Sequence, residues 1–69
     1  MKTSARNQLN GTVTSVQLGA VMAEITLDVS GVTMVAAITK ESAERLGLAE
    51  GKAVSAIIKA TDVMIGVED

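Results

Sequence analysis

A regular alternation of apolar and polar residues over positions 21–30 is the feature that most constrains the fold. The apolar members are Val21, Ala23, Ile25, Leu27 and Val29. Successive side chains of a strand point to opposite faces of a sheet, so this pattern predicts a strand with one buried and one wet face. Ser30-Gly31 then predicts a turn into a second strand over 32–39.

The strand predicted over 32–39 is apolar on both faces. One face carries Val32, Met34, Ala36 and Ile38, and the other places Val35 and Ala37 between two threonines. In so small a protein, a strand of this kind predicts a second buried surface. Either a barrel that closes on itself or another subunit would supply that surface.

Strands are also predicted near both ends of the chain. The first runs over about 8–18, where the apolar residues change phase near Thr14 or Ser15, which predicts a bulge and a bend. A further strand is predicted over 53–60 and a short last one over 63–67, ahead of an acidic end.

Between the third and fourth predicted strands, residues 39–46 have the signals of a helix of about two turns. Thr39 is the expected N-cap and Gly47 the expected left-handed residue after the last turn. Three strands, a short helix and two more strands is the element order of a small five-stranded barrel of the oligonucleotide/oligosaccharide-binding (OB) type. The expected fold is therefore mainly β.

The size of the chain predicts self-association. A single domain of 69 residues buries only about 60% of the surface that its unfolded chain exposes. The sequence has no Cys and no His, so disulfides and thiolate or imidazole metal sites cannot compensate. Because 48% of the residues are hydrophobic and none is aromatic, we expect an obligate oligomer that hides apolar surface between subunits.

Composition also argues against several functions. A net charge of −2 without Phe, Tyr or Trp is unlike proteins that stack bases and neutralise phosphates. Without His or Cys the common catalytic triads are excluded, and Glu24 and Asp28 would lie about 13 Å apart on a strand, too far for paired acid/base work. We expect no enzyme activity. Neither a signal peptide nor a membrane-spanning run is apparent, so a cytoplasmic location is the default expectation.

Three clusters of hydrogen-bond donors remain as candidates for chemistry. They are Ser4 with Arg6, Thr39 with Ser42 at the start of the helix, and Lys59-Ala60-Thr61 at the end of the fourth strand. Donors without carboxylates suit an oxyanion. Each cluster also has an ordinary structural interpretation. Ser4 and Arg6 can be a solvent-exposed strand edge, and Thr39 and Ser42 the cap and first turn of a helix. Lys59 can be a solvent-exposed charge at the end of a strand.

Five motifs together resemble one known family, the molbindins, which consist of a single Mop domain. They are Ser-Ala-Arg-Asn-Gln-Leu-x-Gly at 4–11, Gly-Ala-Val-x-Ala-Glu at 19–24, Ile-Thr-x-x-Ser at 38–42, Leu-Gly-Leu-x-x-Gly at 46–51 and Ile-Lys-Ala-Thr-Asp-Val-Met at 58–64. The resemblance covers nearly the whole chain, as one Mop domain over 1–69. It implies OB-type barrels that exchange strands within dimers, and three dimers in a hexamer that stores molybdate or tungstate at its interfaces.

The resemblance also implies a site. Ser4, Arg6, Lys59 and residue 60 would bind the oxyanion from one subunit, with Thr39 and Ser42 from a neighbour. Ala60 departs from relatives that have serine there, so it would contribute only its N–H group unless Thr61 substitutes. The family has a second class of site near the threefold axis, whose residues the motifs do not assign.

Two other functions fit the same fold. One is a nucleic-acid-binding OB module, against which the acidic, aromatic-free composition argues. The other is an assembly module without a ligand, in which the apolar surface serves self-association and the donor clusters have no role.

Overall fold

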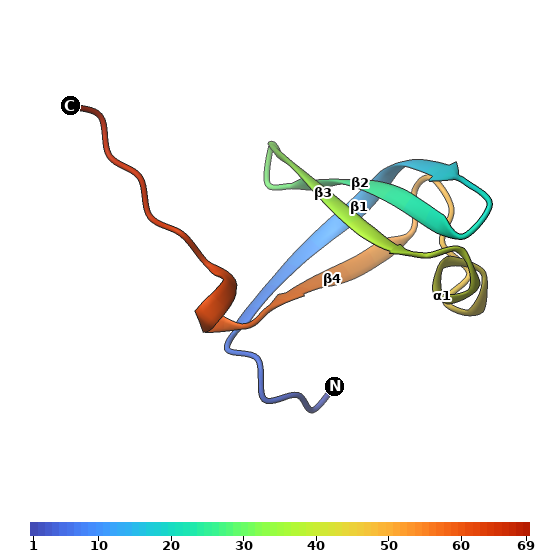
Figure 1. The fold of residues 1–69 in the computed structure, drawn as a ribbon, viewed down its shortest axis with the longest axis horizontal. Helices are drawn as coiled ribbons and strands as arrows, with labels where there is room; N and C mark the ends of the chain where they lie inside the picture. Colours follow the sequence, from blue (N-terminus) through green and yellow to red (C-terminus); the bar gives the residue numbers. More distant parts are fainter.

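The computed structural model describes residues 1–69 as four strands, one short helix and a 3-10 turn. The elements in order are β1 (Asn7–Leu18), β2 (Met22–Val29), β3 (Val32–Thr39), α1 (Lys40–Arg45), β4 (Ala53–Ile58) and η1 (Ala60–Asp62). The strands form one antiparallel sheet in the order β3-β2-β1-β4, with α1 at one end of it (Figure 1). The prediction of a mainly β fold with one short helix is confirmed.

The predicted bulge in β1 is present and bends the strand. The register of β1 against β2 shifts between Val13 and Ser15, and the extra residue, Thr14, donates its hydroxyl to the Thr26 carbonyl at 3.2 Å. The bulge lies next to Thr12, where β1 changes partner. The first half of β1 pairs with β4 and the second half with β2, so one strand joins both halves of the sheet.

The ends of α1 also follow the sequence signals. Thr39 is the N-cap and accepts a hydrogen bond from the Ser42 N–H at 3.0 Å. Gly47, with φ of 63°, donates to the Glu44 carbonyl, and Leu48 donates to that of Ala43, which is a Schellman end. The helix has six residues, and no helix of the chain has the length and apolar character needed to cross a membrane.

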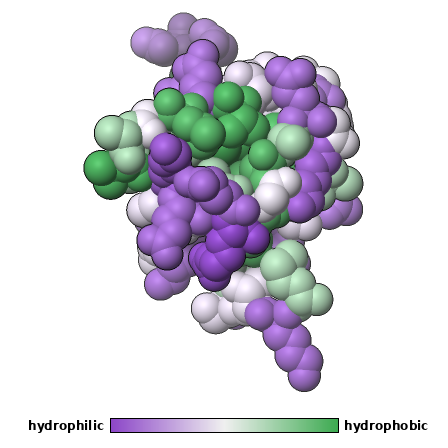
Figure 2. Space-filling model, turned by 90° about the vertical axis from the view of Figure 1, so that its right-hand side faces the viewer, coloured by the Kyte–Doolittle hydropathy of each residue, from purple (hydrophilic) through white to green (hydrophobic).

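The core of the chain is very small. Five buried residues form it, namely Val13, Ala23, Ile25, Leu27 and Ala43, and three of these come from the alternating face of β2. Among the other members of the predicted apolar faces, Met34 and Ile38 are only partly buried against this core, and Val21 and Val32 are 70% and 62% exposed. Hydrophobic surface bordered by hydrophilic side chains is visible on the face in Figure 2. The single chain thus leaves much of its apolar surface uncovered.

The structure differs from the sequence prediction at the C-terminal segment. Residues 63–67 form no strand, and β3 and β4 are the free edges of an open four-stranded sheet. After η1 the segment runs away from both edges (Figure 1), and the exposed fraction of Ile65 is 87%. A strand requires a hydrogen-bonding partner along its length, and the segment meets none in its own chain. The five-stranded closed barrel is therefore not formed by one chain alone.

Gly11 in β1 makes a close contact that a side chain would disrupt. A Cβ atom there would lie 2.9 Å from the Asp28 carbonyl oxygen and 3.0 Å from Val29 Cγ2. We expect Gly11→Ala to lower the free energy of unfolding by about 1–3 kcal/mol, because backbone atoms must move to admit the methyl group. Gly66→Ala is the matched control, since nothing lies within 4 Å of its added Cβ. Equal denaturant midpoints for the two variants would show that this contact is not tight.

Candidate functional site

The pairing of β1 with β4 brings two of the predicted donor clusters together. The ladder between these strands ends with Asn7 opposite Ile58. Arg6 directly precedes Asn7 and Lys59 directly follows Ile58, so both cations lie at this end of the ladder. Arg6 comes from the start of the chain and Lys59 from near its end. Only the fold makes them neighbours.

Both of these cations are exposed. The side-chain hydrogen bonds of the chain involve neither the Arg6 guanidinium nor the Lys59 ammonium. Two positive charges held at the same end of a sheet repel each other. An anion bound between the two side chains would remove that repulsion and would accept hydrogen bonds from both.

Backbone donors lie directly beside these cations. Lys59 is the N-cap residue of η1, and its side chain makes no capping hydrogen bond. The first N–H groups of a helical turn have no partner inside the turn, so Ala60 and Thr61 present backbone donors next to Lys59. Both residues are exposed, as is Ser4. Thr61 has the hydroxyl group that Ala60 lacks.

Asn7 has a positioning role that the sequence alone did not reveal. Its Nδ2 donates to the Ile58 carbonyl oxygen at 3.2 Å, which ties the start of β1 to the end of β4. Gln8 Nε2 donates to the carbonyl of the buried Ala5 at 3.3 Å. Together these amides hold the segment around Arg6 against the sheet. Their only signal in the sequence was the amide-rich run beside Arg6.

Thr39 and Ser42, the third donor cluster, lie at the junction of β3 and α1. Thr39 Oγ1 donates to Ser42 Oγ at 2.8 Å and accepts from the Ser42 N–H at 3.0 Å. The Thr39 hydroxyl proton is therefore engaged within the cluster. The Ser42 hydroxyl proton remains available to a ligand, so Thr39 positions the donor that Ser42 offers.

This third cluster does not join the other two within one chain. Thr39 pairs with Met22 at the end of the sheet where Leu18 closes β1, whereas Arg6 precedes the opposite end of β1. The 12 residues of β1 correspond to about 35 Å of extended chain before bending. Donors from both ends can meet at one ligand only if they come from different subunits.

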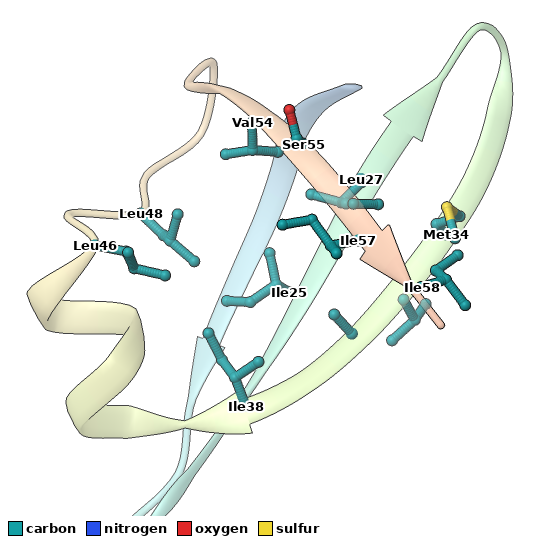
Figure 3. Close-up of a pocket in the computed structure, with 13 residues that line it drawn as sticks. Ile25, Leu27, Met34, Ile38, Leu46, Leu48, Val54, Ser55, Ile57 and Ile58 are labelled. Atoms are coloured by element: carbon teal, nitrogen blue, oxygen red, sulfur yellow. The ribbon is translucent and has the colours of Figure 1, made fainter. Parts of the chain in front are cut away.

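An apolar groove lies between the two free edges of the sheet. It has a volume of about 310 Å³, and 12 of the 13 residues that line it are hydrophobic. Ile25 and Leu27 of β2, Ile38 of β3, Leu48 after α1 and Ile58 of β4 point into it (Figure 3). Ser55 is its one polar residue, so the groove suits an apolar segment rather than an anion.

The structure also gathers no group of three or more His, Cys, Asp or Glu side chains that could hold a metal ion.

Comparisons with known proteins decide the family. Residues 3–65 match the TOBE domain family. The chain is 48% identical over 66 residues to molybdenum-pterin-binding protein 3 of Clostridium pasteurianum, an alignment that covers 94% of this chain and 97% of the relative. The chain belongs to the Mop family of TOBE-domain proteins. The resemblance predicted from the five sequence motifs is therefore confirmed.

Solved structures of Mop-family proteins share the fold. A molybdate-binding protein from Sporomusa ovata superposes with a TM-score of 0.93 at 43% identity, covering 97% of this chain and all of that one. The cytoplasmic molybdate-binding protein ModG, solved with molybdate bound, gives a TM-score of 0.92 at 45% identity and covers 99% of this chain. This chain spans 49% of the ModG chain.

Proposed function

We propose that this Mop-family protein, as a single Mop domain over 1–69, binds molybdate or tungstate at interfaces between identical subunits. The observation that carries the proposal is the pair Arg6 and Lys59, two exposed cations that adjoin the last pair of the β1–β4 ladder, Asn7 with Ile58, and have no hydrogen-bonding partners of their own. The molybdate-binding neighbour supports it, and the donor motifs of this chain fall within residues 3–65, which match the TOBE domain family. We place the protein in the cytoplasm, as ModG is described, and assign it a storage role in molybdenum homeostasis rather than an enzymatic one.

The proposed binding residues are all donors. Arg6 and Lys59 supply two positive charges, Ser4 and Thr61 supply hydroxyl groups, and Ala60 supplies a backbone N–H. The Ser42 hydroxyl of a neighbouring subunit, positioned by Thr39, completes the set. A dianion that carries no proton is bound best by donors alone, whereas hydrogen phosphate carries a proton that needs an acceptor. Sulfate is also proton-free, so we attribute its exclusion to the size of the cavity.

The apolar groove and the C-terminal segment support the proposed assembly. A fifth strand between β3 and β4 would pair with both free edges and close the barrel. Val63, Ile65 and Val67 alternate along the exposed segment, so they would fall on one face of such a strand and fill the groove. We propose that the segment of a second copy occupies it, giving strand-exchanged dimers, of which three form the hexamer. Exchange of an identical element is a low-cost route to a dimer.

The relatives' names include pterin as well as molybdenum. A pterin ring is commonly held by stacking on aromatic side chains, and this chain has no Phe, Tyr or Trp. The donors described above fit a small tetrahedral anion. We therefore propose the inorganic oxyanion as the ligand of this chain.

The two-subunit site is tested by the double variant Thr39→Val, Ser42→Ala. Because these residues would complete the site from the neighbouring subunit, we expect equilibrium dialysis to find fewer molybdate ions bound per subunit than in the wild type. The native mass should stay unchanged, since Thr39 is exposed, Ser42 is half-buried and neither residue belongs to the core. Full wild-type stoichiometry in the double variant would mean that the site lies within one subunit.

A further inference from the structure

Asp62 introduces a negative charge into the turn that carries the proposed anion donors. It is the last residue of η1, and its N–H group donates to the Lys59 carbonyl at 2.9 Å. In a turn closed in this way the Cα atoms of the first and fourth residues lie within about 7 Å of each other. A carboxylate is thus held close to Lys59, Ala60 and Thr61 whenever the turn is formed.

The Asp62 carboxylate accepts no hydrogen bond from within the chain. The residue is exposed, and its carboxylate takes part in none of the side-chain hydrogen bonds. Its oxygens are therefore not occupied by a donor of its own chain. Asp62 also adds a negative charge to a group of donors that otherwise contains the two cations Arg6 and Lys59.

We propose that Asp62 weakens the binding of dianions at the Lys59–Thr61 turn and so determines how readily the bound oxyanion leaves. This inference rests on the proposed function, because it concerns the same site. Repulsion between one negative charge and a dianion about 6–13 Å apart, in a mostly aqueous environment, corresponds to roughly a three- to tenfold change in affinity. The effect on a singly charged anion would be smaller, because Coulomb repulsion scales with the charge of the ligand.

The test compares two variants that change the net charge of the chain equally. Asp62→Asn removes the charge in the turn. Glu50→Gln removes one from an exposed position before β4, at the end of that strand away from η1. In calorimetric titrations with sodium molybdate at low salt, we expect Asp62→Asn to bind about three- to tenfold more tightly than the wild type, and Glu50→Gln to match the wild type. The gain should shrink in about 0.5 M NaCl, because salt screens exposed charges.

A second variant, Asp62→Ala, separates charge from hydrogen bonding and should show the same gain. Native mass measured on each sample ensures that only the site has changed. If wild type and Asp62→Asn bind molybdate equally, or if the variant binds more weakly, Asp62 does not oppose the anion and the inference is wrong while the proposed function stands. If the wild type binds no molybdate, both are wrong.

Discussion

Replacing Ile65 by aspartate is expected to weaken self-association by at least about a hundredfold. In the proposed assembly this side chain, now 87% exposed, enters a groove whose lining is hydrophobic except for Ser55. Losing a buried isoleucine costs about 1.5–3 kcal/mol for each of the two exchanged segments, and an unpaired carboxylate in the groove costs more. Sedimentation velocity over a range of protein concentrations measures the change directly.

Met64→Asp is the matched control for this prediction. Met64 is the neighbour of Ile65 and would fall on the opposite face of the added strand. Its replacement should therefore weaken association much less than Ile65→Asp does. Equal mass for wild type and Ile65→Asp at micromolar concentration would show that the C-terminal segment does not fill the groove.

Arg6→Ala is expected to weaken molybdate binding by at least tenfold while the oligomer stays intact. The change removes one of the two cations at this end of the ladder and a fork of N–H donors that matches an oxyanion, and charge-assisted hydrogen bonds are among the strongest. Arg6 is exposed and makes no side-chain hydrogen bond within the chain, so its loss should leave the fold unchanged. Calorimetry gives the affinity, and light scattering on the same sample gives the mass.

Arg6→Lys distinguishes the two contributions of this side chain. Lysine keeps the positive charge but not the planar fork, so we expect an affinity between those of the wild type and Arg6→Ala. An affinity equal to that of the wild type in both variants would remove Arg6 from the site. The Lys59 cluster would then have to bind the anion without it.

Local sequence signals predicted the elements whose structure depends on neighbouring residues. The alternation over 21–30 gave β2, the phase change in β1 gave the bulge at Thr14, and Thr39 and Gly47 gave the ends of α1. Each of these depends on side-chain periodicity or on a backbone conformation within a few residues. Such features can be inferred from a short stretch of sequence.

Features that depend on residues far apart in the sequence could not be predicted from local sequence patterns. Arg6 and Lys59 lie at the same end of one ladder only because β1 pairs with β4, a strand far from it in the sequence. The role of Asn7 depends on the same pairing. The segment over 63–67 has the composition of a strand, but a strand also needs an edge to pair with, and its own chain does not provide one. The composition of residues 63–67 could not show that the chain lacks an edge for them to pair with.

The most direct test of the central claim is a calorimetric titration of the wild-type protein with molybdate, repeated in excess sulfate and in excess phosphate, with the native mass determined on the same sample. We predict micromolar or tighter binding that survives both competitors, at about one or more anions per subunit of an oligomer. No heat and no saturation, or binding lost in sulfate or phosphate, would contradict a selective molybdate site built from these donors.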